Sequence, residues 1–89
     1  MKIKDDFVKI RIADECFVVP VGEQAVDFYG IITLNGTAEF MWDCLEEDKT
    51  REELITAMLE EYDIDRMTAE TDIDEFIGVL TKNNLLDKG

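Results

Sequence analysis

The stretch LNGTAEFMWDCL, Leu34 to Leu45, decides the fold expected of this chain. The residues before it alternate as β-strands do, and the residues after it contain two further helix starts. Asn35 fits an N-cap, because its side chain can accept a hydrogen bond from a backbone N–H that has no partner in the first turn of a helix. Trp42 lies on the flank of a helical stripe formed by Phe40, Met41, Cys44 and Leu45. The chain is therefore predicted to change from strand to helix at Asn35.

A first strand is predicted at Phe7–Ile12, where apolar and basic side chains alternate. The apolar face consists of Val8, Ile10 and Ile12, and the opposite face carries Lys9 and Arg11. Such alternation is typical of a strand with one buried face. We therefore expect the apolar face to pack on the rest of the domain.

Two more strands are predicted upstream of the first helix. Cys16–Val21 is expected to pair with the first strand as a hairpin. Pro20 has no backbone N–H to donate, so it marks a strand end or an edge position. Phe28–Leu34 forms the third strand, and Gly30 within it indicates a bulge or the close approach of another backbone.

Two helices are predicted after the first one. Thr50–Glu53 (TREE) is a capping box, and it opens a helix with the core stripe Leu54, Ile55, Met58, Leu59 and Tyr62. A third helix is expected from Met67 to Lys82, with a stripe of Ala69, Ile73, Phe76, Ile77 and Leu80. Asn83–Asn84 is a suitable stop because asparagine tolerates the left-handed conformation. Leu85–Leu86 is then expected to pack back onto the core.

The order of these elements predicts the fold class. A chain of 89 residues makes one domain, here residues 1–89. Three strands in an antiparallel sheet followed by three helices make an α+β domain that is winged helix-turn-helix-like. No segment approaches the roughly 20 apolar residues that cross a bilayer, and the N-terminus lacks the apolar core of a signal peptide. We therefore expect a soluble cytoplasmic protein.

The charge distribution limits the classes of partner. The net charge is −13, of which residues 1–34 carry −2 (four basic, six acidic) and residues 35–89 carry −11 (five basic, sixteen acidic). Such a surface repels nucleic-acid phosphates and anionic lipid, and it favours basic or neutral partners. A DNA recognition helix needs Lys and Arg, but the third helix has only Arg66 and Lys82, at its two ends. We therefore expect neither nucleic acid nor membrane as a partner.

The sequence lacks the residues that several classes of catalysis and metal binding require. The sequence contains no histidine and no serine, which excludes Ser-His catalysis, histidine-ligated metals and a phosphopantetheine attachment serine. Asp63-x-Asp65 resembles the start of a calcium loop, but Thr68 stands where the loop requires glycine. Cys16 and Cys44 are expected to be free thiols, with a disulfide or redox pair as the alternative. We expect a non-enzymatic protein with no catalytic residue, no metal and no cofactor.

The backbone of the third strand offers a different function. If that strand lies at a sheet edge, an extended peptide can add to it, with main-chain hydrogen bonds for affinity and side-chain pockets for specificity. A neighbouring helix would form the second wall of the groove. One stripe of the third helix borders its core face and consists of Asp72, Phe76, Val79 and Asn83. The alternative is that Val79 completes the core or a dimer contact.

Several segments together resemble the PqqD family, the pyrroloquinoline quinone biosynthesis protein D and its relatives, which are RiPP recognition elements. The resemblance covers nearly the whole chain and depends on the order and spacing of the segments. They are Val18-Val-Pro-Val-Gly22, Ile32-Thr-Leu-Asn35 followed by Thr37-x-x-Phe40-x-Trp42, Lys49-Thr-x-Glu-Glu-Leu54, and Tyr62-Asp63 leading to Asp72-Ile-x-x-Phe76-x-x-x-Leu80. Gly36 departs from the family, whose members often carry an acid there.

The resemblance implies that the chain is a peptide chaperone. It would bind the leader of a ribosomally made precursor peptide and present it to a modifying enzyme, often a radical SAM enzyme. Carried onto this sequence, the peptide-binding residues would be Phe28, Tyr29, Gly30, Ile31, Ile32, Thr33 and Leu34 on the third strand and Asp72, Phe76, Val79 and Asn83 on the third helix. The alternative is an acidic winged-helix module for protein interaction or regulation. An exposed edge could also pair with a second copy and give a homodimer.

Overall fold

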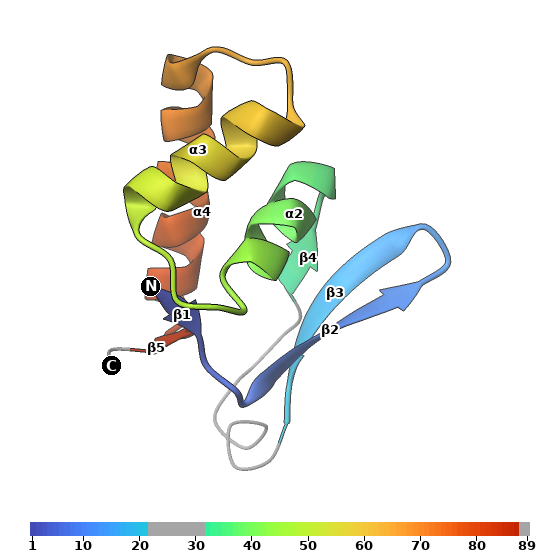
Figure 1. Ribbon diagram of the computed structural model, residues 1–89. Helices are drawn as coiled ribbons and strands as arrows, with labels where there is room; N and C mark the ends of the chain where they lie inside the picture. The colour runs from blue at the N-terminus through green and yellow to red at the C-terminus, as the bar shows by residue number, and fades with distance from the viewer. Residues whose placement is uncertain (22–31, 88–89) are drawn as a thin grey trace.

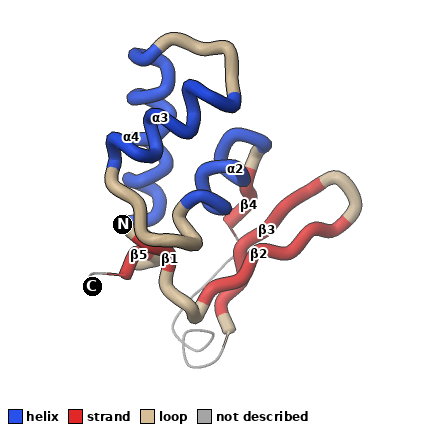
Figure 2. The backbone as a smooth tube through the Cα atoms, in the orientation of Figure 1, coloured by secondary structure: helices blue, strands red, loops and turns tan. Residues whose placement is uncertain are grey.

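The computed structural model describes residues 1–21 and 32–87 of the chain, and Figures 1 and 2 show their arrangement. The elements in chain order are β1 (Lys2–Ile3), β2 (Phe7–Ile12), β3 (Glu15–Pro20), β4 (Ile32–Leu34), α2 (Gly36–Cys44), α3 (Arg51–Glu61), α4 (Arg66–Lys82) and β5 (Leu86–Asp87). The predicted α+β class, a three-stranded antiparallel sheet with three helices after it, is confirmed. Of the predicted third strand, Phe28, Tyr29, Gly30 and Ile31 lie outside the described residues.

The three-stranded sheet has the order β2-β3-β4, and both pairs are antiparallel. The predicted hairpin is confirmed, with Phe7 opposite Pro20 at its open end and Ile12 opposite Glu15 at its turn. Ala13 makes the turn with a positive φ of 56°. Pro20 is the last residue of β3, where a missing N–H costs the ladder least.

A second, two-stranded sheet was not foreseen from the sequence. β1 pairs antiparallel with β5, and Figure 1 shows the two ends of the described chain side by side. The Ile3 N–H also donates to the Leu45 carbonyl oxygen at 2.8 Å, and the Lys4 N–H donates to that of Leu85 at 2.9 Å. Strands of two residues are too short to show any periodicity, so the sequence alone carried no signal for them.

The predicted helix starts are confirmed by their hydrogen bonds. The Ala38 N–H donates to Asn35 Oδ1 at 2.8 Å, and the capping box at Thr50 and Glu53 has both of its bonds. Asp65 caps α4 by accepting from the Thr68 N–H at 2.8 Å. The second acid of the Asp63-x-Asp65 pattern is therefore a helix cap. Within the described residues, none of the helices combines the length and the hydropathy needed to cross a bilayer.

The core lies between the three helices and one face of the sheet. Its fully buried side chains include Val18, Trp42, Leu45, Leu54, Ile55, Met58, Ile73, Leu80 and Leu85. Trp42, expected on the flank of its helix, is only 1% exposed, whereas Phe40 is half-buried and packs edge-on against Tyr62 with ring centroids 5.5 Å apart. The helix therefore turns Trp42 toward β2, and the predicted stripe was wrong by about one position. Both cysteines are free, Cys16 buried and Cys44 half-buried.

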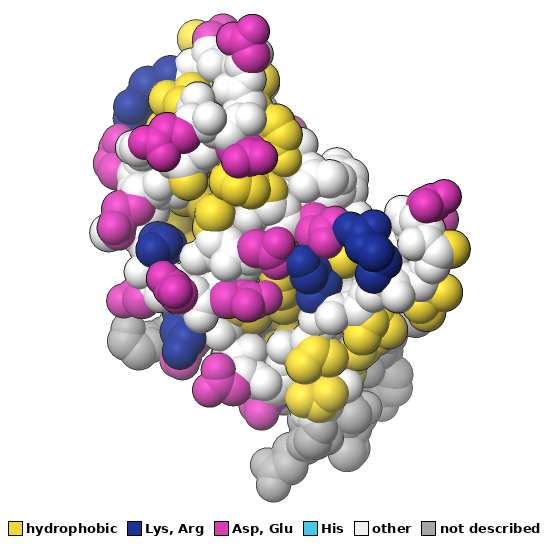
Figure 3. Space-filling view, turned by 45° about the vertical axis from the view of Figure 1, so that its right-hand side comes forward, with side chains coloured by type: hydrophobic (Ala, Val, Ile, Leu, Met, Phe, Trp, Pro, Cys, Tyr) yellow, Lys and Arg dark blue, Asp and Glu magenta, His cyan; other side chains and the backbone are white. Residues whose placement is uncertain are grey.

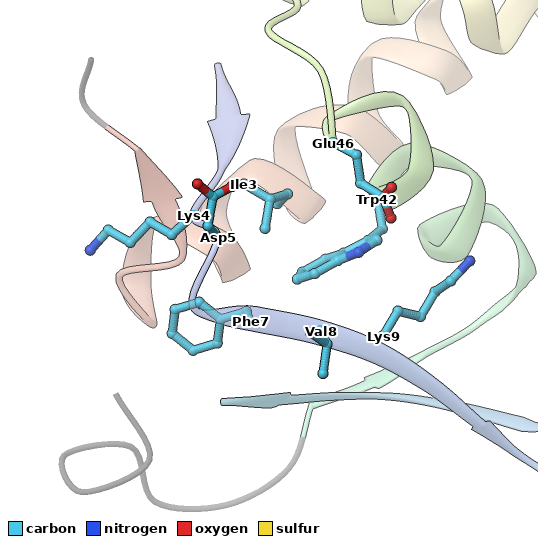
Figure 4. A pocket seen from close by; sticks show the side chains of 8 residues that line it. All are labelled: Ile3, Lys4, Asp5, Phe7, Val8, Lys9, Trp42 and Glu46. Atoms are coloured by element: carbon cyan, nitrogen blue, oxygen red, sulfur yellow. The ribbon is translucent and has the colours of Figure 1, made fainter. Parts of the chain in front are cut away.

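The structure corrects the expected orientation of β2. Val8, Ile10 and Ile12 are 38%, 37% and 60% exposed, while Lys9 and Arg11 face α2. Figure 4 shows Lys9 rising toward α2 and Val8 pointing to the opposite side of the strand, and Figure 3 shows apolar side chains at the surface of this part of the molecule. Acids on α2 give the two basic side chains partners, and Phe7 supplies the buried apolar contact at the start of the strand.

Candidate functional site

The candidate site begins at the edge of the sheet formed by β4. One side of β4 pairs with β3, and no strand among residues 1–21 and 32–87 pairs with its other side. Side chains alternate along it: Leu34 is 5% exposed and lies in the core, Ile32 is half-buried, and Thr33 is exposed on the opposite face. This edge is where an added strand would find backbone donors and acceptors.

A pocket lies where this edge ends. β4 stops at Leu34, and the next residue, Asn35, caps α2 and lines a cavity of about 230 Å³ between α2 and α4. We call it the α2–α4 pocket. Its lining residues are Asn35, Thr37, Ala38 and Met41 from the start of α2 and Asp72, Glu75, Phe76 and Val79 from α4. The pocket therefore continues the open edge into a hollow between two helices.

The floor of the α2–α4 pocket is apolar, and its charged lining residues are all acidic. Met41 and Phe76 are 3% and 6% exposed and form its floor, while Val79 is 42% exposed at its wall. Asp72 and Glu75 are one helical turn apart on α4, and neither forms an ion pair with a Lys or Arg of the described residues. The site can thus take an apolar side chain that has a cationic neighbour.

The predicted site residues are only partly brought together. Asp72, Phe76 and Val79 line the α2–α4 pocket, as the helical stripe would require. Asn83 does not line it: this residue is the C-cap of α4, and its Nδ2 donates to the Val79 carbonyl oxygen at 2.9 Å. Ile32, Thr33 and Leu34 form the described part of the edge.

Sequence reasoning missed the wall that α2 contributes. Residue type and spacing identify Asn35 only as a helix cap and Met41 only as a core residue. Their place in the site follows from the position of α2, whose first turn directly follows the open strand and faces α4. A signal was present in the sequence, because a helix that begins one residue after an edge strand must lie close to that edge.

A larger hollow lies at the other edge of the sheet, and Figure 4 shows it. This cavity of about 400 Å³ lies between β2 and α2, and we call it the β2–α2 pocket. Its lining residues are Ile3, Lys4, Asp5, Phe7, Val8, Lys9, Trp42 and Glu46. Basic and acidic side chains both line it, in contrast to the α2–α4 pocket.

Ion pairs cross from β2 to α2 beside this second pocket. Lys9 Nζ lies 3.1 Å from Glu39 Oε2 and 2.6 Å from Asp43 Oδ1, and Arg11 also pairs with Glu39. Hydrogen bonds from Arg11 and then from Lys9 hold the pKa of Glu39 below its ordinary value. Partial burial acts to lower the pKa of Lys9, but Asp43 and Glu39 together outweigh it and raise that pKa. These pairs fasten the hairpin to α2.

The comparisons with known proteins agree with the fold. Residues 21–86 match the family described as coenzyme PQQ synthesis protein D (PqqD). A solved structure described as TbiB1 in complex with the TbiA(beta) leader peptide is 31% identical, with a TM-score of 0.77, and the match covers 100% of this chain and 98% of that one. No curated protein matches the chain significantly. Because the family match covers more than two thirds of its length, this chain belongs to the PqqD family.

Proposed function

We propose that this chain is a non-catalytic peptide chaperone that binds the leader of a ribosomally made precursor peptide and presents it to a modifying enzyme, such as a radical SAM enzyme. The observation that supports it most is the β4 edge, which has no second partner strand in the described part of the chain and leads into the α2–α4 pocket with its apolar floor. The structural neighbour TbiB1, which aligns over the whole chain, was solved with a leader peptide bound.

Strand addition uses the backbone of β4 and the wall of α4. The leader would extend the sheet beside Ile32–Leu34, where its main chain adds a strand to the side of β4 that faces no other described strand. Because side chains alternate along a strand, every second leader residue points toward the helices. One of these enters the α2–α4 pocket and contacts Met41, Phe76 and Val79.

The charges of the site favour a particular leader chemistry. Asp72 and Glu75 border the apolar floor, and the whole protein carries −13. An acidic leader would be repelled, whereas Lys or Arg beside the apolar anchor would be attracted. We therefore expect the leader to combine alternating apolar residues with basic ones.

A displayed library of random peptides, selected against the purified chain, tests this proposal without knowledge of the precursor. The selected peptides should be extended, with apolar residues at alternate positions and flanking Lys or Arg. The best binder is then resynthesised with single N-methyl groups along its backbone. Strand addition requires that methylation at alternate positions removes binding and at the intervening positions does not, because only every second N–H of a strand faces β4.

The alternative, an acidic winged-helix interaction or regulatory module, gives a different result. Such a module would bind a folded partner through its acidic helices, and no extended peptide would be selected. A homodimer through the β4 edge would be broken up by the selected peptide, since both use the same backbone groups. Sedimentation of the chain with and without the peptide separates these cases.

A further inference from the structure

The face of the three-stranded sheet that points away from the helices is apolar and open. Side chains on it come from β2 and β3 and from the residue after β3: Val8, Ile10, Ile12, Phe17, Val19 and Val21. We call this set the outer face. Four of its members are among the six most exposed large apolar side chains of the described residues, at 37% to 60% exposure. Figure 3 shows apolar side chains gathered over the β2–β3 hairpin.

Packing among residues 1–21 and 32–87 does not account for this face. The helices cover the opposite side of the sheet, where Cys16, Val18 and Leu34 are buried. Single exposed apolar residues are common, but a contiguous apolar patch of a few hundred Å² is often a functional surface. The other two exposed apolar side chains, Met67 and Val79, lie apart from it on α4.

The charges around the outer face define the partner. Asp6 stands at one end of the hairpin, and Asp14 and Glu15 stand at its turn; all three are exposed, and none forms an ion pair with a described Lys or Arg. In a two-fold stack of two copies, an acidic end would meet an acidic end whichever way the strands run. A partner surface with an apolar centre and a rim of Lys and Arg has no such conflict.

The size of the outer face connects it to the peptide site. β2 and β3 have six residues each. At about 3.3 Å per residue and about 4.8 Å between strands, the three-stranded face measures roughly 20 by 15 Å, or roughly 300 Å². A stable interface buries about 800 Å² per partner, so this face alone would bind weakly. A strand added beside β4 widens the same sheet, and its outward side chains continue the rows that contain Phe17 and Thr33.

We propose that the outer face, extended by the bound leader, is the docking surface for the enzyme that modifies the precursor, through an apolar, basic-rimmed patch of that enzyme. This inference rests on the proposed function, because the leader strand supplies part of the surface. The two faces of the bound leader strand then have separate functions. Leader side chains that face the helices bind this chain, and leader side chains that face outward contact the enzyme. Binding of leader and enzyme is then coupled, and each strengthens the other by the same factor.

The probe is the purified radical SAM enzyme proposed above as the partner, titrated against the chain with and without saturating leader. Leader should raise the affinity for the enzyme by about 5- to 150-fold, the usual range of such couplings. Ile10→Lys should weaken enzyme binding at least about tenfold, because it places a cation at the centre of the patch opposite a basic rim. It should leave leader affinity within about twofold, because Ile10 lies on β2, two strands away from the β4 edge.

Two further variants make the result specific. Met67→Lys makes the same chemical change at a 75% exposed residue of α4 and should alter neither affinity. Ile12→Ser, at the far end of the hairpin, should weaken enzyme binding without adding a charge, and it replaces Ile10→Lys if that variant unfolds. Wild-type affinity for the enzyme in both outer-face variants would overturn the proposal. A wild-type dimer that Ile10→Lys dissociates would assign the face to a second copy and overturn it as well.

Failure of the proposed function is distinguishable from failure of this inference. If the wild-type chain binds no leader, the proposed function fails whatever the enzyme does. If leader binds to the wild-type chain and to Ile10→Lys equally, but the enzyme also binds both equally, only the outer-face inference fails.

Discussion

The two edges of the sheet are treated differently by the helices. At the β2 edge, Lys9 and Arg11 reach across to Glu39 and Asp43 of α2, and Trp42 packs behind them. At the β4 edge, no described strand or basic side chain closes the sheet, and the α2–α4 pocket is lined by acids that have no cationic partner among the described residues. Glu39 and Asp43 are paired with cations where the hairpin is fastened to α2, whereas Asp72 and Glu75 have no cationic partner among the described residues at the pocket where we propose that a leader strand binds.

One helix makes both environments. Met41 and Trp42 are neighbours in α2, yet Met41 lines the α2–α4 pocket and Trp42 lines the β2–α2 pocket. Successive residues of a helix point about 100° apart, so a single turn of α2 can present one side chain to each edge. The two edges share one helix and differ in whether the acids beside them form ion pairs. Each variant below changes one edge alone.

The largest effect is expected from Trp42→Ala, which removes the buried aromatic side chain at the β2 edge. Trp42 is 1% exposed, and removal of a buried aromatic side chain costs about 3–5 kcal/mol in the free energy of unfolding. Chemical denaturation measures the loss, and Met67→Ala, at a 75% exposed site, should change stability by less than about 0.5 kcal/mol. A loss below about 1 kcal/mol for Trp42→Ala would show that α2 is not anchored through this residue.

The next effect compares two valines of nearly equal exposure. Val79 is 42% exposed in the α2–α4 pocket, and Val8 is 38% exposed on the outer face of β2, at the other edge of the sheet. Val79→Asp places a third carboxylate beside Asp72 and Glu75, and it should weaken leader binding by about 100-fold, equivalent to about 2.7 kcal/mol.

Val8→Asp is the matched control for this variant. It should leave leader affinity unchanged, because Val8 lies at the other edge of the sheet. Fluorescence anisotropy with a selected peptide compares the two variants. Equal losses in both would mean that the peptide does not distinguish the edges, and the contrast between them would then have no functional meaning.

Much of the fold could be predicted from local signals. The caps at Asn35 and Thr50, the hairpin and the left-handed stop at Asn84 follow from residue types at fixed spacing, and each was confirmed. The face of β2 could not be read in this way. Alternation shows that the two faces of a strand differ, but the acids of α2 that make the basic face the inner one are separated from β2 by about 30 residues in the sequence.

The candidate site could be predicted only in part, because local spacing identifies residues on one helix but not how two helices pack together. The stripe Asp72, Phe76 and Val79 shares one helix, so its spacing alone places it on one wall. The opposite wall, with Asn35 and Met41, depends on how α2 packs on α4, which no local pattern records. Asn83 continues the stripe by spacing, but the helix ends there, and the Asn83 side chain turns back to donate to the Val79 carbonyl oxygen.

A smaller effect on leader affinity is expected when the acids of the α2–α4 pocket are neutralised. The double variant Asp72→Asn and Glu75→Gln should weaken a Lys- or Arg-containing leader by about 3- to 10-fold and reduce the salt dependence of its binding. The matched control removes two charges from the other pocket with Asp5→Asn and Glu46→Gln, and it should change neither quantity. If both double variants weaken binding equally, the attraction comes from the overall charge and not from the pocket.

The smallest effect concerns the pH dependence of the stability that the ion pairs at the β2 edge contribute. Arg11 and Lys9 hold the pKa of Glu39 below its ordinary value of 4.5, so the stability that this carboxylate contributes is present above pH 4.5 and is lost as the pH falls through the lowered value. Glu39→Gln should therefore be less stable than wild type at neutral pH, and the difference should shrink steadily below pH 4.5. Denaturation curves recorded across this range measure it. Leader affinity at neutral pH should be the same for both proteins, because Glu39 belongs to the fastened edge; a loss of leader binding in Glu39→Gln would show that the two edges are coupled through α2.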